Sequence, residues 1–393
     1  MSAKGDARFG PRSRLLILTT DYPPSRGGIQ TLSLRLAEGL GAFDAYVLAP
    51  DGPDAGGFDS SRAGRVARSP APPRIGSGRH VLLNAYALRE ALRVRPALTL
   101  SMHILTSPAA AAIAASGGSR TVQYYHAQEI PHRPRLAAFA ARRAHANVVV
   151  SGYTARLLEA LGVPQTELTR IPPGVELPLD PAPLPVDRPT ILTVARLVDR
   201  YKGHDVLARA LVEVRRDVPA AEWVVIGDGP RRGELEGLVG SLGLAGAVRF
   251  LGSVSDAERD AWLRRANVFA MPSRLPGTGR AGEGFGIAYL EASAYGKPVI
   301  AGNVAGAVDA VANGESGLLV DPQDHLAVAG ALTRLLLDTP LAARMGAAGA
   351  ERARRFAWPT IIARVQELLL ATLRGERPGD AGPNRGERAP SAA

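Results

Sequence analysis

The chain has 393 residues, 46% of them apolar, and carries a formal net charge of +10 at pH 7. This length fits about two domains of ordinary size, and the apolar content is enough for a large core. The chain contains no cysteine, which excludes a disulfide framework and thiolate metal sites, and no apolar run approaches the roughly 20 residues of a membrane-spanning helix.

The positive charge is concentrated in the first half of the chain. Between Arg62 and Arg156 there are fourteen arginines and no lysine, against only Glu90 and Glu129 as acidic residues. This asymmetry predicts that the first half meets an anionic partner, although a GC-rich genome would also explain the arginine content.

The two ends of the chain differ in composition from the rest. Residues 1–13 carry charges and glycine without the apolar core of a signal peptide, and we expect a mobile leader there. Residues 375–393 are rich in Gly, Pro, Arg and Glu and are expected to form a disordered tail. We expect a cytoplasmic protein, either free or peripheral on the inner face of the cell membrane.

Residues 14–180 predict a first α/β domain. An apolar run at 14–20 predicts a buried strand, Gly27 and Gly28 follow in a loop, and helical spacing begins at Leu32. A strand, a glycine loop and a helix are the start of a doubly wound unit, with an ordinary tight turn as the alternative for the two glycines. Further strands are predicted at 45–49, 97–101, 120–125 and 147–151, and residues 50–62 are predicted to form a loop.

His126 stands at the carboxyl end of the predicted strand 120–125. Open α/β sheets bind their ligands at this edge, so His126 is a candidate site residue. The alternative is a histidine that only packs or lies on the surface.

Two helices of this half are rich in arginine. A helix over residues 81–92 shows one apolar stripe, formed by Val81, Ala85, Leu88 and Leu92. A second helix, over 135–145, has Leu136 and Phe139 on one face with arginines around it. Two interpretations are open for this helix: a core-facing helix with a solvated arginine face, or a helix that lies on an anionic membrane surface.

A proline-rich linker ends the first domain, and the pattern restarts over residues 187–357. Strands are predicted at 190–195, 223–226, 248–251, 268–271, 298–301 and 317–320, with helices between them. A last helix, over 358–373, is expected to cross back to the first domain. Alternating strands and helices in two blocks predict two doubly wound, Rossmann-like parallel sheets that face each other across a cleft.

The stretch 283–291 reads Glu-Gly-Phe-Gly-Ile-Ala-Tyr-Leu-Glu and predicts a loop that enters a helix near Gly286. Glycine lets main-chain amides approach an anion, and a helix N-terminus presents free N–H groups to it. With Glu283 and Glu291 at its ends, the stretch predicts a site for a phosphorylated ligand whose hydroxyls are held by carboxylates. A loop and a buried helix with one surface acid is the alternative.

Arg196 and Lys202 both follow the first predicted strand of the second domain. Two cations beside a glycine loop and a helix N-terminus are suited to clamp a diphosphate, whereas either one alone could be a surface ion pair. The sequence offers no dense cluster of His, Asp and Glu for a tightly held metal.

These motifs occur in the order of a known family. Arg196 to Gly203, Gly227-Asp-Gly-Pro230, the Glu283 and Glu291 pair and Gly296-x-Pro298 resemble the retaining nucleotide-sugar glycosyltransferases of family 4, which have the GT-B fold. The resemblance covers roughly residues 14–373. The phrase that runs from Tyr22 to Gln30 resembles the phosphatidyl-myo-inositol mannosyltransferase branch in particular.

The resemblance implies a role for each position. Arg196 and Lys202 would bind the donor diphosphate and stabilise charge on the departing nucleotide. Glu283 would hold a sugar hydroxyl, Glu291 the ribose hydroxyls, and His126 would lie near the transferred sugar. The main-chain amides of four residues would line the sugar and phosphates, namely Gly284, Phe285, Gly286 and Ile287. The first loop would close on donor and acceptor through Gly27 and Gly28.

The predicted reaction moves a hexose, with mannose favoured, from a GDP- or UDP-linked sugar to a hydroxyl acceptor. The acceptor is either an anionic lipid or a soluble natural-product or polysaccharide precursor. Fixed donors aimed at the leaving phosphate supply the largest stabilisation, and no tightly bound cofactor is expected. The alternative is a non-catalytic protein of the same fold that binds nucleotide sugars or uses its basic surface. Nucleic acid is not expected, because no recognised binding module and few interleaved aromatics are present.

The chain departs from the family at two places. Ala305-Gly306 and Asp309 stand where the family commonly has Gly-Gly and a glutamate. After His126 comes Ala-Gln-Glu, where a second histidine is frequent in the mannosyltransferase branch. Both departures leave the identity of donor and acceptor open, but not the reaction class.

Overall fold

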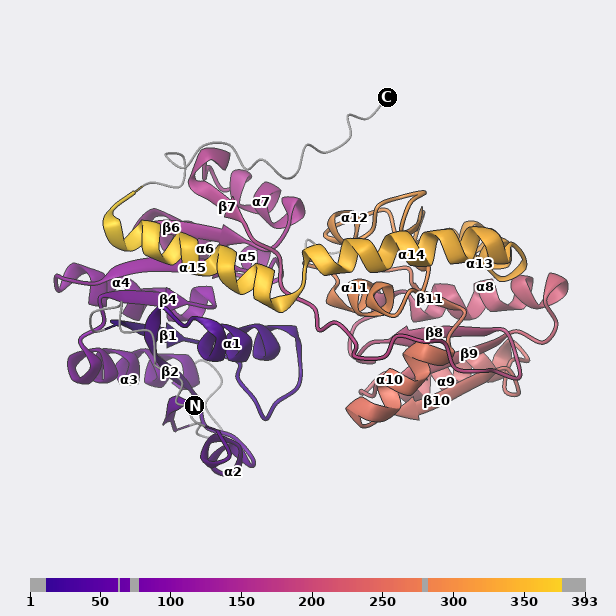
Figure 1. Cartoon of the computed structure of the whole chain (residues 1–393), viewed down its shortest axis with the longest axis horizontal. Coiled ribbons are helices and arrows are strands. Elements are labelled where there is room, and N and C mark those ends of the chain that lie inside the picture. Colours follow the sequence, from indigo (N-terminus) through magenta and orange to yellow (C-terminus); the bar gives the residue numbers. More distant parts are fainter. Residues whose placement is uncertain (1–11, 63, 71–77, 278–281, 377–393) are drawn as a thin grey trace, which may run out of the picture.

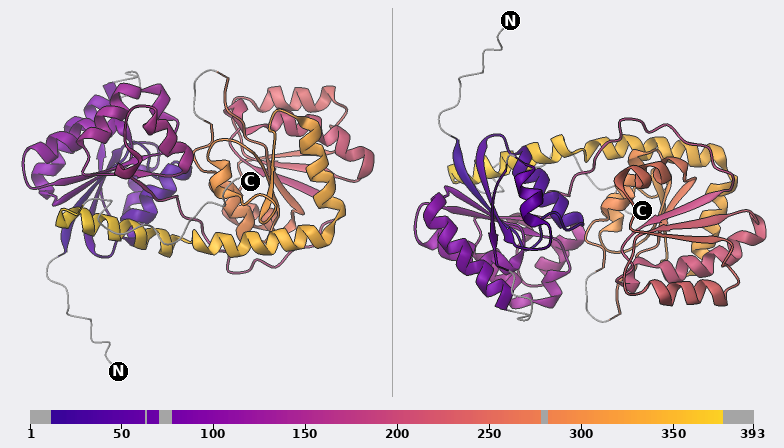
Figure 2. Two further views of the ribbon diagram at one scale, coloured as in Figure 1. Left: turned by 90° about the horizontal axis from the view of Figure 1, so that it is seen from above. Right: turned by 90° about the horizontal axis from the view of Figure 1, so that it is seen from below.

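The computed structural model describes residues 12–62, 64–70, 78–277 and 282–376. Two parallel sheets lie side by side, each with helices on both faces (Figure 1, Figure 2). The predicted fold class of two doubly wound α/β units is therefore confirmed. Residues 1–11 of the expected leader, 377–393 of the expected tail and 278–281 of the loop before Glu283 lie outside the described residues.

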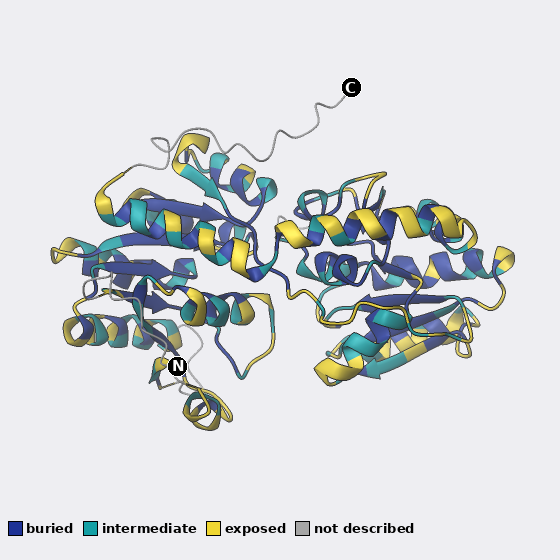
Figure 3. Ribbon diagram, in the orientation of Figure 1, coloured by how far each residue is buried: buried dark blue, intermediate teal, exposed yellow. Residues whose placement is uncertain are grey.

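The first sheet has seven parallel strands in the order β3-β2-β1-β4-β5-β6-β7. Its strands are β1 (Ser13–Leu18), β2 (Phe43–Pro50), β3 (Arg65–Ser69), β4 (Leu98–Ser101), β5 (Arg120–Tyr125), β6 (Ala146–Val149) and β7 (Leu168–Arg170). The helices around it are α1 (Gly28–Gly39), α2 (Ala55–Ser60), α3 (Gly78–Val94), η1 (Ile104–Thr106), α4 (Ser107–Ala115), α5 (Glu129–His132), α6 (Pro134–Arg143), α7 (Gly152–Glu159) and η2 (Gln165–Glu167). Central strands such as β4 and β6 are buried along their whole length, as expected for a sheet that helices cover on both faces (Figure 3).

The prediction of a plain loop over residues 50–62 is wrong, because α2 lies within it, and the edge strand β3, which follows it, was not predicted. The β3 sequence Arg-Val-Ala-Arg-Ser lacks a strong apolar pattern, since an edge strand has only one paired neighbour. Its two arginines pair instead with acids of neighbouring segments: Arg65 with Asp44 and Arg68 with Asp59.

The apolar stripe of α3 faces solvent. The exposed fraction is 71% for Val81, 42% for Leu88 and 79% for Leu92, and Ala85 is exposed as well. The opposite face, with Leu83 and Ala87 fully buried, packs onto the sheet. This face therefore supplies the contacts with the core, and the stripe read from the sequence does not.

Helix α6 is oriented the other way. Its buried residues are the alanines Ala137, Ala140 and Ala141, while Leu136 and Phe139 are partly buried and Leu136 packs against a buried cluster. The alternative interpretation of this helix, a core-facing helix with a solvated arginine face, therefore fits the structure better than a helix lying on a membrane.

The second sheet has six parallel strands in the order β10-β9-β8-β11-β12-β13. Its strands are β8 (Thr190–Val194), β9 (Glu222–Ile226), β10 (Val248–Gly252), β11 (Val268–Met271), β12 (Val299–Gly302) and β13 (Gly317–Val320). Its helical segments are η3 (Arg200–Lys202), α8 (His204–Asp217), α9 (Arg232–Ser241), α10 (Asp256–Arg265), α11 (Ile287–Ala294), α12 (Ala307–Ala310), α13 (His325–Leu337) and α14 (Thr339–Arg355).

The chain passes between the domains twice, and the two crossings are bonded to each other. The N–H of Val175 in the linker donates to the carbonyl of Phe356 at 2.8 Å, and the N–H of Trp358 donates to the carbonyl of Val175 at 3.3 Å. After this point α15 (Trp358–Arg374) runs along the first domain, where Ile361 and Leu369 are fully buried (Figure 1).

No single helix of the described residues is long and apolar enough to cross a membrane. Only α13 and α14 taken together pass by length and composition, and they are bent by 99° at their junction.

Candidate active site

Lys202 and Glu283 come together at the carboxyl edge of the second sheet. Lys202 ends the turn η3 after β8, and Glu283 lies in the loop between β11 and α11. Lys202 Nζ is 2.5 Å from Glu283 Oε2, and only 19% and 14% of the two side chains are exposed. The structure thus joins two of the residues that the sequence predicted for one site.

The ion pair keeps Lys202 charged in spite of its burial. Burial lowers the pKa of the ammonium, but the charge of Glu283 and a hydrogen bond to it outweigh burial and hold the pKa above its ordinary value. The ammonium also lies 5.0 Å from the ring centre of Tyr201. A desolvated cation with donor positions left over is suited to bind an anion.

The loop that carries Glu283 depends on two glycines. Gly286 has a φ of 95°, in the left-handed region, and α11 begins at the next residue. At Gly284 a Cβ atom would lie 2.1 Å from the carbonyl oxygen of His126 in the first domain, so only glycine allows this approach. The free amides at the start of α11 therefore lie close to the edge of the first sheet.

The other two residues of the loop have separate surroundings. The Phe285 side chain is buried against Phe356, with ring centres 5.6 Å apart, so only its main-chain amide is available to a ligand. The side chain of Ile287 faces the first domain, where a Cβ atom at Gly28 would lie 3.0 Å from its Cδ1. Gly27 precedes α1 in the same loop of the first domain.

His126 is held on three sides at the end of β5. Its main-chain N–H donates to Glu129 Oε1 at 2.6 Å, and its ring is stacked on Tyr124 with ring centres 6.1 Å apart. Its Nε2 lies 2.7 Å from the carbonyl oxygen of Met102, so Nε2 carries the hydrogen and donates it. The Nδ1 atom remains as the acceptor that the ring can offer to a substrate.

Arg196 and Glu291 lie outside the Lys202–Glu283 contact. Arg196 follows β8 and is exposed. Glu291 lies on α11, where burial raises the pKa of its carboxyl group and the charge of Arg259 on α10 opposes that shift. Glu291 lies four positions after Ile287, so both lie on one face of the helix. The structure thus places these residues around the same edge of the sheet without joining them by a direct bond among the described residues.

The first domain contains a cavity of about 390 Å³ at the carboxyl ends of β1, β2 and β3. The carboxylates Asp21 and Asp51, the phenol ring of Tyr22 and the guanidinium of Arg79 contribute to its lining. Burial raises the pKa of Tyr22 to about 12, so its hydroxyl stays protonated. Sequence reasoning missed this cavity, because its walls come from several separate loops and the sequence does not show that these loops lie side by side.

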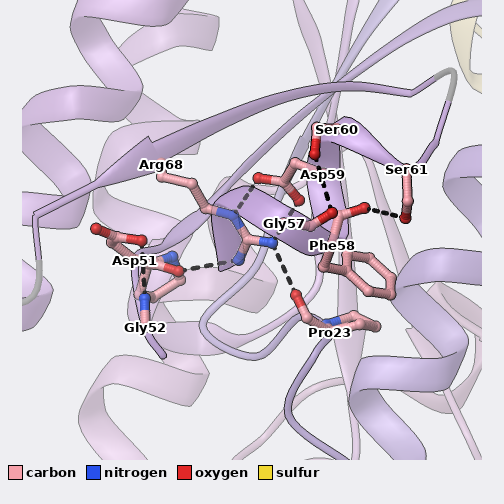
Figure 4. A network of polar contacts seen from close by, with 10 residues as sticks. Pro23, Asp51, Gly52, Gly57, Phe58, Asp59, Ser60, Ser61 and Arg68 are labelled. Atoms are coloured by element: carbon pink, nitrogen blue, oxygen red, sulfur yellow. Dashed lines mark hydrogen bonds and ion pairs between the residues drawn. The ribbon is translucent and has the colours of Figure 1, made fainter. Parts of the chain in front are cut away.

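One wall of the cavity is fixed by Arg68 (Figure 4). Its guanidinium bonds both oxygens of Asp59 at 2.7 and 2.8 Å, and it also donates to the carbonyls of Pro23 at 2.7 Å and Pro50 at 3.1 Å. Since Asp59 lies on α2 and Pro23 in the loop before α1, Arg68 ties three segments together. These hydrogen bonds occupy the Arg68 guanidinium, so it stabilises the fold and does not bind a ligand.

Within the described ranges there is no group of three or more His, Asp or Glu side chains placed to hold a metal ion. The arrangement described above instead offers the buried cation of Lys202, main-chain amides and carboxylates around one edge. This set suits a ligand that combines phosphates with hydroxyls.

Two family patterns together match most of the chain, from residue 26 to residue 352. The pattern described as Glycosyltransferase Family 4 matches residues 26–178, and the pattern described as Glycosyl transferases group 1 matches residues 180–352. The first match covers the seven-stranded unit from α1 onward, without β1, and the second covers the six-stranded unit.

Curated relatives match over their full length. The chain is 36% identical to the GDP-mannose-dependent alpha-(1-6)-phosphatidylinositol monomannoside mannosyltransferase of Mycobacterium tuberculosis, over 91% of this chain and 98% of the relative. It is 36% identical to the enzyme of the same name from Mycolicibacterium smegmatis, over 90% of this chain and 98% of the relative.

Solved structures share the fold. The sucrose-phosphate synthase of Thermosynechococcus elongatus superposes with a TM-score of 0.78 at 23% identity, over 93% of this chain and 100% of that one. Anabaena Alr3699/HepE in complex with UDP superposes with a TM-score of 0.77 at 21% identity, over 91% of this chain and 100% of that one.

Proposed function

Because the chain belongs to the family 4 glycosyltransferases of the GT-B fold, we propose that it is a retaining mannosyltransferase that uses GDP-mannose. The acceptor in this proposal is a hydroxyl group of an inositol-lipid mannoside. Support comes from the relatives, which are named for this donor and this class of acceptor and match over 98% of their length. The observation that carries the proposal is the buried Lys202–Glu283 pair beside the amides of α11.

The donor in this proposal lies along the edge of the second sheet. Lys202 uses its remaining N–H groups on the diphosphate, and Arg196, which is exposed and free to reorient, joins it there. Glu283 and the amides of residues 284–287 bind the sugar, and Glu291 accepts hydrogen bonds from the ribose hydroxyls. His126 offers Nδ1 to a sugar hydroxyl, since Nε2 is occupied by the Met102 carbonyl.

The reaction exchanges one bond at the anomeric carbon for another. The bond between that carbon and the diphosphate oxygen breaks, and its electron pair stays on the diphosphate. The acceptor oxygen forms the new bond on the same face, which retains the configuration, and its proton passes to the leaving diphosphate. Lys202 and Arg196 stabilise the charge that develops on the leaving group, and this is the largest contribution available to such a site.

The acceptor head group occupies the 390 Å³ cavity of the first domain. Asp21 and Asp51 accept hydrogen bonds from its hydroxyls, Tyr22 provides an apolar surface, and Arg79 faces its phosphate. The cavity adjoins the loop with Gly27 and Gly28, which contacts the donor side at Ile287.

Helix α3 carries the contact with the membrane in this proposal, in place of α6. Its exposed stripe of Val81, Ala85, Leu88 and Leu92 is flanked by the exposed Arg89 and Arg93, an arrangement typical of helices that lie in an anionic bilayer surface. Arg79, which lines the cavity, belongs to the first turn of the same helix. A lipid acceptor would therefore reach the cavity along α3, on the inner face of the cell membrane.

A thermal-unfolding screen with nucleoside diphosphates tests the donor. A ligand that binds only the folded state at about 100 times its Kd adds about 2.7 kcal/mol of stability, which is a readily measured shift. GDP is expected to raise the unfolding temperature more than UDP or ADP. If no nucleoside diphosphate raises it, the donor site proposed here is wrong.

A further inference from the structure

Asp309 joins the second domain to the first. Its Oδ1 atom accepts hydrogen bonds from the main-chain N–H of Gly152 and from Nη1 of Arg170, each at 3.3 Å. Asp309 lies on α12 of the second domain, whereas Gly152 begins α7 and Arg170 ends β7 in the first. The carboxylate thus lies at the N-terminus of α7 and beside a guanidinium.

This contact is linked to the loop that carries Glu283. The N–H of Gly306, at the start of the same short segment, donates to the carbonyl oxygen of Glu283 at 2.8 Å. A Cβ atom at Gly306 would lie 2.1 Å from the carbonyl oxygen of Gly284, so the two main chains are in direct contact. A movement of Asp309 toward the first domain therefore moves the backbone that supports Glu283 and Gly284.

The other side of α12 is anchored near the interdomain crossing. Arg352 on α14 donates from Nη2 to the carbonyl of Asp309 at 2.6 Å and from Nε to the carbonyl of Ala310 at 2.9 Å. Phe356, just beyond α14, accepts the hydrogen bond from Val175 where the two crossings meet. The segment of Asp309 thus connects the interdomain crossing, the first domain and the loop that carries Glu283.

The bridge made by Asp309 is incomplete in this structure. Both of its hydrogen bonds are longer than the usual 2.7–3.2 Å range for N–H···O contacts. The second oxygen, Oδ2, is buried and has no hydrogen-bond partner among the described residues. A small approach of the two domains would shorten the existing bonds and bring Oδ2 within reach of the same donors.

We propose that Asp309 is a closure latch, a positioning residue that completes its bonds to Gly152 and Arg170 when a nucleotide sugar draws the domains together. The closed latch holds the Glu283 loop in the arrangement that binds the donor. The inference rests on the proposed function in one respect, that a nucleotide sugar is the ligand that closes the domains. It assigns a role to one of the two places where the chain departs from the family.

The test combines small-angle scattering with kinetics on the full chain. Asp309→Ala is expected to have a larger radius of gyration than the parent without ligand and to contract less on addition of GDP-mannose. Its KM for the donor should rise about five- to tenfold, with a smaller change in kcat. This size corresponds to a weak coupling between the Asp309 contact and donor binding. Asp309→Glu keeps the carboxylate and should restore most of both properties.

Two further variants serve as controls. Asp309→Asn keeps the shape and should change KM and scattering in the same direction, which covers the case in which the alanine variant does not fold. Glu315→Ala, at an exposed acid of the same domain, should behave as the parent. Parental scattering and KM in Asp309→Ala would overturn the latch. If the parent responds to no nucleotide while Asp309→Ala without ligand still has the larger radius of gyration, the proposed donor is wrong and Asp309 still ties the two domains together.

Discussion

Nζ of Lys202 lies 2.5 Å from Oε2 of Glu283, although 81 positions separate the two residues in the chain. Each belongs to a loop that follows a strand of the second sheet, and the parallel arrangement of β8 and β11 brings both loops to one edge. The pair holds the cation that the proposed reaction needs and the carboxylate that would bind the sugar. Its removal is therefore expected to affect both folding and transfer.

Lys202→Ala is expected to lower kcat/KM for transfer by about 10²–10³, the usual cost of losing one group that stabilises a developing anion. It should also destabilise the fold by about 3 kcal/mol, because it leaves Glu283 buried without its partner. Steady-state kinetics and urea unfolding measure the two effects. Arg200→Ala in the same turn removes only the exposed pair with Glu234 and should cost under about 1 kcal/mol with parental transfer. Equal effects of both substitutions would contradict the assignment of Lys202.

Gly284→Ala is expected to prevent the close approach of the two domains. The new Cβ would lie 2.1 Å from the His126 carbonyl, so the Glu283 loop and β5 would be forced apart. Transfer should fall by at least about tenfold, since small misplacements of reacting groups are costly, while circular dichroism stays parental. Gly277→Ala, in the same connection and with no atom of the described residues within 4 Å of the added Cβ, is the matched control. Full activity of Gly284→Ala would show that the contact is not needed.

The fold is expected to lose stability in mild acid because His204 is buried. Burial lowers its pKa from 6.5 to about 4, and it is stacked on Trp223 with ring centres 6.4 Å apart. Between these two pH values the unfolded chain binds a proton that the folded chain does not, so stability falls as the pH drops from 6.5 toward 4, by up to about 3 kcal/mol. His204→Phe removes this proton uptake. Urea unfolding at about pH 7 and about pH 4.5 should show a smaller loss in the variant. The same loss in both chains would contradict the role of His204.

The stripe of α3 predicts binding to anionic vesicles. The parent should sediment with vesicles that contain phosphatidylinositol and should be released by salt, because the arginines act through screened charge. Serine at Val81, Leu88 and Leu92 together should weaken binding by more than about tenfold. Each substitution removes apolar surface that the bilayer would bury, at about 0.8 kcal/mol per CH₂. Serine at Leu326 and Leu337, which are exposed on α13, is the control and should leave binding unchanged. Parental binding of the α3 variant would exclude this helix.

The sequence predicted the two sheets well, because buried parallel strands are continuous apolar runs with glycine or proline at their ends. Predicted boundaries at 268–271 and 317–320 coincide with β11 and β13. The edge strand β3 escaped prediction, since its arginines are held by ion pairs rather than by an apolar face. The sequence also did not show which face of α3 is buried. Both faces carry apolar residues at helical spacing, and only the packing distinguishes them.

For the candidate site, residue types and spacing brought out Lys202 and Glu283, because a cation after the first strand and an acid before a glycine loop and a helix suit a phosphorylated ligand. The sequence could not indicate that the two form a direct ion pair, since this depends on which strands are neighbours in the sheet. It also could not reveal the cavity beside Tyr22 or the bridge made by Asp309. Both are assembled from segments that lie far apart in the chain.

The most direct test of the account is a transfer assay with purified protein, radiolabelled GDP-mannose and vesicles that contain a phosphatidylinositol monomannoside. We expect a labelled lipid with one further mannose in the α-configuration, and loss of this product in Lys202→Ala. Transfer to a soluble acceptor with no lipid product, a β-linked product, or parental turnover in Lys202→Ala would contradict it.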